Sequence, residues 1–218
     1  PFFYPHGYEY AMAEATYSLD MTRIALGEMV SLHVRNSAGS CHTVPFGCDT
    51  DNYRLLEERG RDGVVFYARS GTTRRGFLLA SMGLEEFHRR RPKVPIKEKF
   101  SFPIAWKGLL TPSELNGLYN TSVAGLGMSF TNVSLVVGEM LAAGCIPVVN
   151  DSQDGRLDMH SPYVNWVDPD PSSVADALVE LVDNPPQDVL EISRSTNPGW
   201  SETQKQVAAT IEQVVYGS

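Results

Sequence analysis

Apolar and polar positions alternate between two patterns from residue 63 to the end of the chain. Residues 64–68 form a short run of β-branched and aromatic side chains, which predicts a buried strand. Apolar residues at helical spacing within residues 77–87 then predict a helix that ends before Pro92. The same alternation predicts further strands at residues 123–128, 146–149 and 164–167, and further helices at residues 112–119, 133–143, 172–183 and 201–215. Strands that alternate with helices in this order predict an α/β fold with a Rossmann-like, doubly wound parallel sheet.

The residues before this pattern predict a smaller structure. Scattered apolar side chains within residues 22–37 predict a strand end followed by a surface helix. Residues 43–53 are rich in proline, glycine and aspartate, which favours a turn-rich connector over a regular element. We therefore expect a domain boundary near residues 49–62, preceded by a stub that is too small to bury a core of its own.

Composition and charge limit the kinds of ligand that the chain can bind. Hydrophobic residues make up 42% of the 218 residues, which is enough for an ordinary buried core. The net charge of -8 argues against non-specific binding to nucleic acid, so an anionic ligand would need a local pocket. No apolar run approaches the roughly 20 residues that cross a bilayer, and the first residues lack the plan of a secretion signal. These features predict a cytoplasmic protein.

Residues that often bind metals do not form a metal-type pattern here. Cys41, Cys48 and Cys145 are an odd number without metal-ligand spacing, which predicts reduced thiols. The aspartates within residues 151–158 lack the glycine and the terminal glutamate of a calcium loop. We therefore predict no metal site.

The first candidate site is the turn at residues 69–76, which joins a predicted strand to a predicted helix. Open α/β sheets bind their ligands at such turns. Gly71 and Gly76 allow the backbone to come close, and the start of the helix offers free amides and a positive dipole end. Arg69 and Arg75 can add charge-assisted hydrogen bonds to two phosphate groups. This turn suits a diphosphate, and the alternative is a solvated loop whose arginines meet surface carboxylates.

The second candidate site is residues 129–139, where another predicted strand passes into a helix. Backbone amides near Ser134 and Leu135 would face the same edge of the sheet as the first turn. Glu139 lies within an apolar helix near that edge, so its carboxylate needs hydrogen-bond donors, and the hydroxyls of a ribose are suitable ones. The alternative for Glu139 is an ordinary exposed helix glutamate.

The spacing of these two sites resembles a known enzyme family. Residues 67–69 followed by Arg75 and Gly76 resemble the Gly-Arg and Lys-Gly elements of retaining GT-B glycosyltransferases of the GT4 type. Residues 129–149 resemble that family's E-x7-E region with the helix and strand after it. The likeness is strongest to rhamnosyltransferase-like members, which carry a Ser-Phe-Thr-Asn run of the kind found here.

Two further segments extend the resemblance over nearly the whole chain. Residues 45–53 are similar to the family's interdomain signature, and the helix after Trp200 is similar to the C-terminal segment that crosses back to the first domain. The resemblance thus implies that residues 1–57 are the end of an N-terminal acceptor domain with the interdomain linker. Residues 58–199 would be the nucleotide-sugar-binding Rossmann-like domain, and residues 200–218 the C-terminal crossing helix.

The resemblance also implies roles for individual residues. Arginines would contact the donor diphosphate with help from helix amides, a carboxylate would hold the ribose, and the base would lie near residues 108–111, with Tyr119 nearby. The implied catalytic residues are Arg69, Arg75 and Glu139, and the implied donor-binding residues are Gly71, Gly76, Leu110, Thr131, Asn132, Ser134 and Leu135. Neither a metal nor a cofactor is implied, because the nucleotide sugar is the substrate.

The implied reaction moves a sugar, with rhamnose as the preferred guess, from a nucleoside-diphosphate sugar to a glycan or lipid-linked acceptor with retention. Such an enzyme of polysaccharide biosynthesis would be cytoplasmic and would meet a lipid-linked acceptor at the inner face of the membrane. Its partners would be the donor, the acceptor and the missing N-terminal domain, and nucleic acid would not be among them.

Three departures from the family pattern bear on activity. Thr131 stands where the family has the first carboxylate of E-x7-E, and residues 95–103 are shorter than the strand, glycine turn and return expected there. Only the last part of an N-terminal domain fits into the residues before the linker, so this chain alone would bind donor but transfer poorly. A second hypothesis, from another class, is a non-catalytic Rossmann-like module for binding or assembly.

Overall fold

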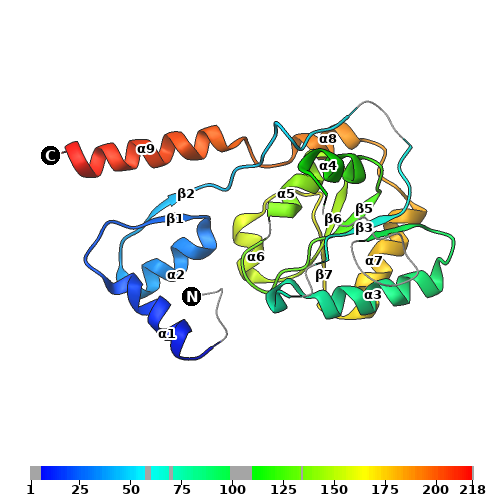
Figure 1. The fold of residues 1–218 in the computed structure, drawn as a ribbon, viewed down its shortest axis with the longest axis horizontal. Coiled ribbons are helices and arrows are strands. Elements are labelled where there is room, and N and C mark those ends of the chain that lie inside the picture. The colour runs from blue at the N-terminus through cyan, green and yellow to red at the C-terminus, as the bar shows by residue number, and fades with distance from the viewer. Residues whose placement is uncertain (1–5, 57–59, 69–70, 99–109, 134, 218) are drawn as a thin grey trace. The chain divides into compact units, whose positions relative to one another are not determined.

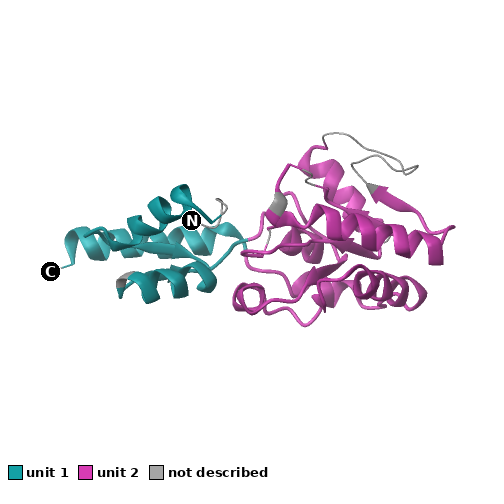
Figure 2. Cartoon of the chain, turned by 90° about the horizontal axis from the view of Figure 1, so that it is seen from below, with its two compact units in different colours: residues 1–47, 199–218 teal, residues 48–198 magenta. Residues whose placement is uncertain are grey.

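The computed structural model of the chain describes residues 6–56, 60–68, 71–98, 110–133 and 135–217. The chain divides into two compact units, which Figure 2 distinguishes by colour. The larger unit comprises residues 48–198, and the smaller unit comprises residues 1–47 together with residues 199–218. The chain therefore passes between the units twice.

The larger unit contains a single sheet of five strands, and every neighbouring pair is parallel. The strands alternate with helices along the chain, so each crossover runs over a face of the sheet (Figure 1). This arrangement confirms the predicted α/β fold with a doubly wound parallel sheet. Across the sheet the order is β4 (Ile96–Glu98), β3 (Val64–Phe66), β5 (Ala124–Leu126), β6 (Ile146–Asn150) and β7 (Asn165–Val167).

The winding of the sheet reverses between β3 and β5. From β3 the chain first crosses to β4 on one side, and it then returns past β3 to β5 on the other side. Strands β6 and β7 continue in that second direction. Open α/β sheets bind their ligands outside the carboxyl ends of the strands at such a reversal. The topology by itself therefore predicts a ligand site at the carboxyl ends of β3 and β5.

Helices cover both faces of this sheet (Figure 1). Each long helix lies where the apolar spacing predicted one, with bounds that differ from the prediction by one or two residues. On one face α3 (Phe77–Arg90) packs against α7 (Pro171–Asp183), and on the other face α4 (Pro112–Asn120) lies beside α5 (Leu135–Ala142).

The buried side chains of the sheet alternate between its two faces. Val64 and Phe66 belong to the core cluster that includes residues of α3 and α7, whereas Val65 belongs to the cluster with α4 and α5. α3 and α7 approach closely at Gly83, where a Cβ atom would lie 2.5 Å from Cγ1 of Val174. Both faces are thus closed over a continuous apolar core, as a parallel sheet requires.

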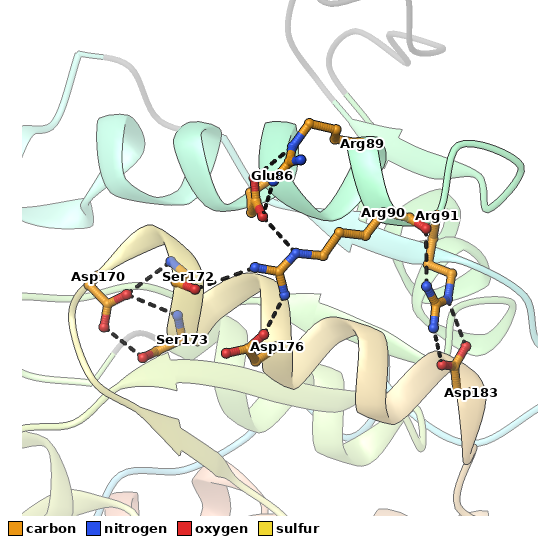
Figure 3. Close-up of polar contacts among 9 residues, drawn as sticks. All are labelled: Glu86, Arg89, Arg90, Arg91, Asp170, Ser172, Ser173, Asp176 and Asp183. Carbon is orange, nitrogen blue, oxygen red and sulfur yellow. Dashed lines mark hydrogen bonds and ion pairs between the residues drawn. The ribbon is translucent and has the colours of Figure 1, made fainter.

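A set of exposed ion pairs joins α3 to α7 at their solvent side (Figure 3). Nε of Arg90 donates to Glu86 at 2.6 Å, and the same guanidinium pairs with Asp176 on α7. Arg91 pairs with Asp183 in the same way. Glu86 also binds Arg89, three residues later along α3.

The sequence patterns missed several short elements. Residues 95–103 were predicted to be shorter than a strand, glycine turn and return, and their described part contains the three-residue strand β4. Asp188 caps one unpredicted helix, because its Oδ1 accepts a hydrogen bond from the backbone N of Glu191 at 2.9 Å. The unpredicted elements are β2 (His42–Val44), β4, α1 (Tyr8–Ala15), α6 (Gln153–Asp158) and α8 (Val189–Arg194).

The smaller unit is built on a sheet of only two parallel strands, β1 (Ile24–Leu26) and β2. Helix α9 (Trp200–Tyr216) packs against β2, and Oγ1 of Thr203 donates to the carbonyl of Pro45 at 2.9 Å. Helix α2 (Glu28–Ala38) follows β1, as the pattern of residues 22–37 predicted, and then leads to β2. This unit exposes many large apolar side chains, namely Tyr8, Met12, Leu19, Met21, Ile24, Leu32, Ile211, Val214, Val215 and Tyr216.

Cys48 and Cys145 are buried and Cys41 is half-buried, and all three carry free thiols. Among the residues that the structure describes, no helix combines the length and the apolar character needed to cross a membrane.

Candidate functional site

Two loops meet at the reversal of the sheet. Residues 67–76 follow β3, and residues 127–134 follow β5, so both loops begin at carboxyl ends of adjacent strands. The backbone N of Phe130 donates to the carbonyl of Arg74 at 2.8 Å and ties one loop to the other. We call these two segments the switch-point loops.

The backbone geometry at residue 76, where the switch-point loops meet, requires a glycine. Its φ of 59° lies in the left-handed region, which favours glycine. A Cβ atom there would lie 2.9 Å from Cε2 of Phe130 and 3.0 Å from Cβ of Met128. A Cβ at Gly71, by contrast, would meet nothing within 4 Å. The close approach expected of both glycines thus occurs within the protein at Gly76 alone.

The guanidinium of Arg75 bridges the two loops. Its Nη1 donates to Oγ of Ser129 at 2.7 Å and to the carbonyl of Asn132 at 3.2 Å. Arg75 is the last residue of the short helix η2 (Thr73–Arg75), directly before α3. The Arg75 guanidinium is therefore held at the N-terminal end of α3, by the backbone of its own loop and by its side-chain contacts to the other loop.

A small cavity lies beside Arg75 between the ends of β3 and β5. Its volume of about 10 Å³ corresponds to roughly one water molecule. Gly127 contributes bare backbone to its wall. The other lining residues are Phe66, Tyr67, Arg75, Leu126, Met128 and Val136.

The N-terminal ends of α3 and α5, which follow the switch-point loops, differ from those of α4 and α7. α3 begins at Gly76 without a side-chain cap, and neither α3 nor α5 has an acidic residue in its first turn. In contrast, Thr111 and Glu114 form a capping box on α4, and Asp170 caps α7. The helix dipoles of α3 and α5 therefore add positive potential at the switch-point loops that no first-turn carboxylate offsets.

The loop after β5 carries three of the residues that the resemblance assigned to donor binding. Oγ1 of Thr131 donates to Oδ1 of Asn132 at 3.3 Å, and both residues are half-buried. Leu135 is exposed and is the first residue of α5. The carbonyl of Asn132 accepts from Arg75, and Phe130 binds Arg74, so the structure brings parts of the two predicted sites together.

Glu139 lies one turn along α5 from Leu135 and is half-buried. Burial is the main reason that the pKa of the Cys48 thiol rises to about 11, and the charge of Glu139 adds to this rise. Burial and then the same charge raise the pKa values of Tyr53 and Tyr119. The carboxylate of Glu139 therefore borders a cluster of aromatic and thiol groups on the face that carries α4 and α5.

The region proposed for the base is described only in part. Leu110 is half-buried and directly precedes Thr111, the N-cap of α4. Tyr119, in contrast, is fully buried at the opposite end of that helix, with its ring 6.2 Å from that of Tyr53. Its ring therefore belongs to the core and offers no surface to a ligand, which corrects the expectation that it lies near the base.

Two of the predicted site residues, Arg69 and Ser134, fall outside the described residues. Within the described ranges, no group of three or more histidines, cysteines, aspartates or glutamates is placed to hold a metal ion.

Sequence reasoning missed the contact between Ser129 and Arg75 and the residue Asn150. Ser129 is the hydrogen-bond partner of Arg75, and Asn150 at the end of β6 binds the backbone of Ser129. The only signal for Asn150 is a polar residue at the carboxyl end of an otherwise apolar strand.

No known protein-family profile matches the chain, and no curated protein matches it in sequence. Solved structures do match its fold. HepE of Anabaena, solved with UDP and glucose, superposes with a TM-score of 0.69 at 11% identity over 93% of this chain. A glycosyltransferase from Rickettsia africae gives a TM-score of 0.67 at 11% identity over 99% of this chain. AviGT4, a glycosyltransferase involved in avilamycin A biosynthesis, gives 0.57 at 16% identity over 85% of this chain.

These proteins are longer than the present chain. The matched region spans 62% of AviGT4, 66% of HepE and 69% of the Rickettsia africae protein. At such low identity the likeness concerns the fold, since one fold hosts many functions. The chain has a Rossmann-like α/β fold with a five-stranded parallel sheet that matches GT-B glycosyltransferase structures.

Proposed function

We propose that the chain is the donor-binding part of a retaining glycosyltransferase of the GT4 type. The enzyme would transfer a sugar from a nucleoside diphosphate to a glycan or a lipid-linked acceptor. The observation that carries this proposal is the position of Arg75, which is held across the switch-point loops at the N-terminal side of two helices.

Charge complementarity supports a diphosphate at this place. The chain as a whole is acidic, with a net charge of -8, yet the switch-point loops combine an arginine with two helix ends that lack acidic first-turn residues. Phosphate oxygens accept hydrogen bonds from such amides and from guanidinium groups. HepE, which shares the fold, was crystallised with UDP and glucose, and this supports a nucleotide sugar as the ligand.

The same groups would assist the reaction. When the bond between the sugar and the diphosphate breaks, negative charge grows on the diphosphate and positive charge on the sugar ring. Arg75 and the helix amides would stabilise the departing diphosphate, and they would do so without a metal ion. Glu139 lies four residues after the start of α5, about 6 Å along the helix axis. From there its carboxylate would accept hydrogen bonds from the ribose.

A deoxyhexose such as rhamnose is the sugar that we propose. Residues 129–132 resemble the corresponding run of rhamnosyltransferase-like enzymes. Thr131 and Asn132 supply a hydroxyl and an amide where the family has a carboxylate, and they are bonded to each other. A neutral pair of this kind suits a sugar that has one hydroxyl fewer than a hexose.

We also propose that the smaller unit is the end of an acceptor-binding domain in a longer protein. Its two-stranded parallel sheet leaves Ile24 and other apolar side chains exposed. Parallel sheets are normally covered on both faces, and a two-stranded sheet alone is marginally stable. Further strands of the same domain would cover these residues. The full enzyme would act in the cytoplasm, at the inner face of the membrane when its acceptor is lipid-linked.

Isothermal titration calorimetry of the chain with dTDP, UDP, GDP and ADP tests the donor site. The best of the four is then compared with the same nucleotide carrying its sugar. We expect selective binding of one diphosphate, which would also identify the base. Absence of binding for all four would reject the proposal.

Thr131 favours one other function, a non-catalytic binding or assembly module. A hydroxyl in place of the family's carboxylate removes an ionisable group from beside the donor sugar. The two functions differ in turnover. Release of free nucleoside diphosphate by the longer protein in the presence of acceptor supports the enzyme, whereas donor binding without release supports the module.

A further inference from the structure

Asn150 is a buried polar residue that the proposed donor contacts do not use. It is the last residue of β6 and is 1% exposed. Its Oδ1 accepts a hydrogen bond from the backbone N of Ser129 at 2.7 Å, and its Nδ2 donates to the carbonyl of Ser129 at 2.8 Å. The side-chain amide thus pairs with the backbone of the neighbouring segment just as a strand would.

This pairing begins where the regular sheet ends. β5 ends at Leu126, and the last backbone contact to β6 is from the N of Gly127 to the carbonyl of Val148 at 3.0 Å. Beyond that point the loop turns away, and the amide of Asn150 satisfies backbone groups that would otherwise be buried without partners. Buried polar groups are costly unless they are bonded, so this contact fixes the path of the loop.

Ser129 links the backbone pairing with Asn150 to the side chain of Arg75. The serine is 2% exposed, and its backbone N and carbonyl both bind Asn150. Its hydroxyl donates to the carbonyl of Asn132 at 2.7 Å, which commits its single proton. A lone pair of the same Oγ atom then accepts the hydrogen bond from Nη1 of Arg75.

From these contacts we infer that Ser129 and Asn150 are positioning residues, which hold the Arg75 guanidinium in the orientation that binds the donor diphosphate. This inference rests on the proposed function. An arginine side chain loses much rotational freedom when it binds an anion, and a guanidinium that is already fixed loses less. The contact from Asn150 through Ser129 to Arg75 therefore raises affinity without touching the ligand.

The chain provides a matched control at a distance from the site. Asn120 is 2% exposed at the end of α4, and its Nδ2 donates to the carbonyl of Arg54 at 2.9 Å. Its Oδ1 accepts from the backbone N of Leu56 at 2.8 Å. Asn120 thus binds backbone groups with the same two atoms as Asn150, but it does not contact the switch-point loops through them.

The test compares Asn150→Leu with Asn120→Leu in the full 218-residue chain. For each variant, calorimetry with UDP, dTDP, GDP and ADP gives Kd, and thermal unfolding gives Tm. Both substitutions leave buried backbone groups unpaired, so both should lower Tm. Only Asn150→Leu should also weaken the tightest diphosphate, by about tenfold.

Ser129→Ala removes the hydroxyl that contacts Arg75 and Asn132 and leaves the backbone pairing between Ser129 and Asn150 in place. We expect it to raise Kd by about tenfold, and we expect Ser129→Thr, which keeps the hydroxyl, to restore binding to within about twofold. In an Arg75→Ala background the Ser129→Ala change should add less than about twofold, because the two residues act as a unit.

The outcomes separate this inference from the proposed function. If Arg75→Ala itself binds all diphosphates like the unaltered chain, the proposed function is rejected, and the inference fails with it. If Arg75→Ala weakens binding while Ser129→Ala and Asn150→Leu do not, only the positioning role is overturned. Equal weakening by Asn120→Leu and Asn150→Leu would also overturn it, since the effect would then be one of general stability.

Discussion

Two arginines lie at opposite edges of the same sheet and bind different kinds of groups. At the amino edge, Nη1 of Arg61 donates to the carbonyls of Tyr119 and Ser122 at 3.3 and 3.2 Å, and Nη2 donates to that of Ala143 at 2.7 Å. At the carboxyl edge, Arg75 bridges two loops in front of helix N-termini. Both side chains are half-buried, so their degree of burial does not explain the difference.

The helix dipoles explain the difference between the surroundings of Arg61 and Arg75. The carbonyls that Arg61 binds lie at the C-terminal ends of α4 and α5, where the dipoles are negative and favour a cation. Burial lowers the pKa of Arg61, and the three carbonyls accept hydrogen bonds from its buried guanidinium. Arg75 lies at the positive ends of α3 and α5, where a second positive charge favours an anionic ligand. This difference supports a structural role for Arg61 and the proposed ligand-binding role for Arg75.

Of the two cavities beside these arginines, the larger lies at the other edge. A cavity of about 480 Å³ lies beside Arg61, against about 10 Å³ beside Arg75. Yet the polar groups that line the larger cavity, including Arg61 and Asn120, already bind backbone atoms of the protein. The reversal of the sheet and the charge of the helix ends are therefore better guides to the ligand site than volume.

Replacing each of the two arginines with alanine, in separate variants, is the most direct test of this comparison. Arg61→Ala should destabilise the fold by roughly 2–3 kcal/mol, because three carbonyls lose a charged donor. Arg75→Ala should instead raise the Kd of the tightest nucleoside diphosphate by about 10- to 150-fold, which corresponds to about 1.5–3 kcal/mol. Urea unfolding and calorimetry measure the two quantities on the same samples.

Each arginine variant is the control for the other. The Kd of Arg61→Ala should stay within about twofold of the unaltered chain, measured at a temperature where the variant is folded. The assignment is wrong if Arg61→Ala loses ligand while Arg75→Ala loses only stability.

The comparison also shows which features a sequence can predict. The spacing of apolar residues located α3, whose 14 residues are enough to reveal a period, and a run of β-branched and aromatic residues located β3. Helices of six residues, such as α6 and α8, contain fewer than two turns and were missed. The two-residue differences at helix ends reflect caps and frayed turns rather than a wrong pattern.

The candidate site likewise contains some residues that the sequence predicts and others that it does not. Arg75 and Gly76 could be predicted because a charged, glycine-containing turn after a strand has a local signature. The contact between Asn150 and Ser129 could not, because it joins residues that are 21 positions apart and depends on the register of β5 and β6. Likewise, the sequence does not show which helix ends Arg61 and Arg75 face, since these are set by the fold.

Gly76 and Gly71 provide the next largest contrast, within a single loop. Gly76→Ala places a Cβ in left-handed backbone and 2.9 Å from the Phe130 ring, so we expect a loss of about 1–2 kcal/mol in stability and weaker diphosphate binding. Gly71→Ala should change stability by less than about 0.5 kcal/mol, because the position is open. Urea unfolding of both variants, followed by titration with the tightest diphosphate, tests this. Equal losses in stability at the two positions would contradict the geometry.

Glu139→Gln tests whether the carboxyl edge binds more than phosphate. If Glu139 accepts hydrogen bonds from the ribose, the variant should weaken the tightest nucleoside diphosphate by about fivefold, or about 1 kcal/mol. Inorganic pyrophosphate, which has no ribose, should bind both proteins equally. Removal of the charge should also lower the pKa of Cys48 from its value of about 11, which a thiol titration can follow. A similar loss for both ligands would mean that Glu139 acts on the phosphates or on the fold.

Arg90→Ala should have the smallest effect, although Arg90 lies on the same helix that Arg75 precedes. Hydrogen bonds from Arg89 and Arg90 lower the pKa of Glu86 below its ordinary 4.5, so this stabilisation is present above that pH. It is lost as the pH falls through the lowered value, when Glu86 becomes protonated in the folded state. Exposed ion pairs contribute little, so we expect a decrease in Tm of no more than about 2 °C at pH 7.

The difference in Tm between Arg90→Ala and the unaltered chain should shrink below about pH 4, and thermal unfolding from pH 3 to 7 measures it. Diphosphate affinity at pH 7 should be unchanged, because the pairs in Figure 3 join the outer surfaces of α3 and α7 and do not include the switch-point loops. A clear loss of affinity would mean that the attachment of α3 to α7 helps to orient Arg75. The contrast between the two edges would then rest on the placement of a whole helix as well as on the sign of its dipole.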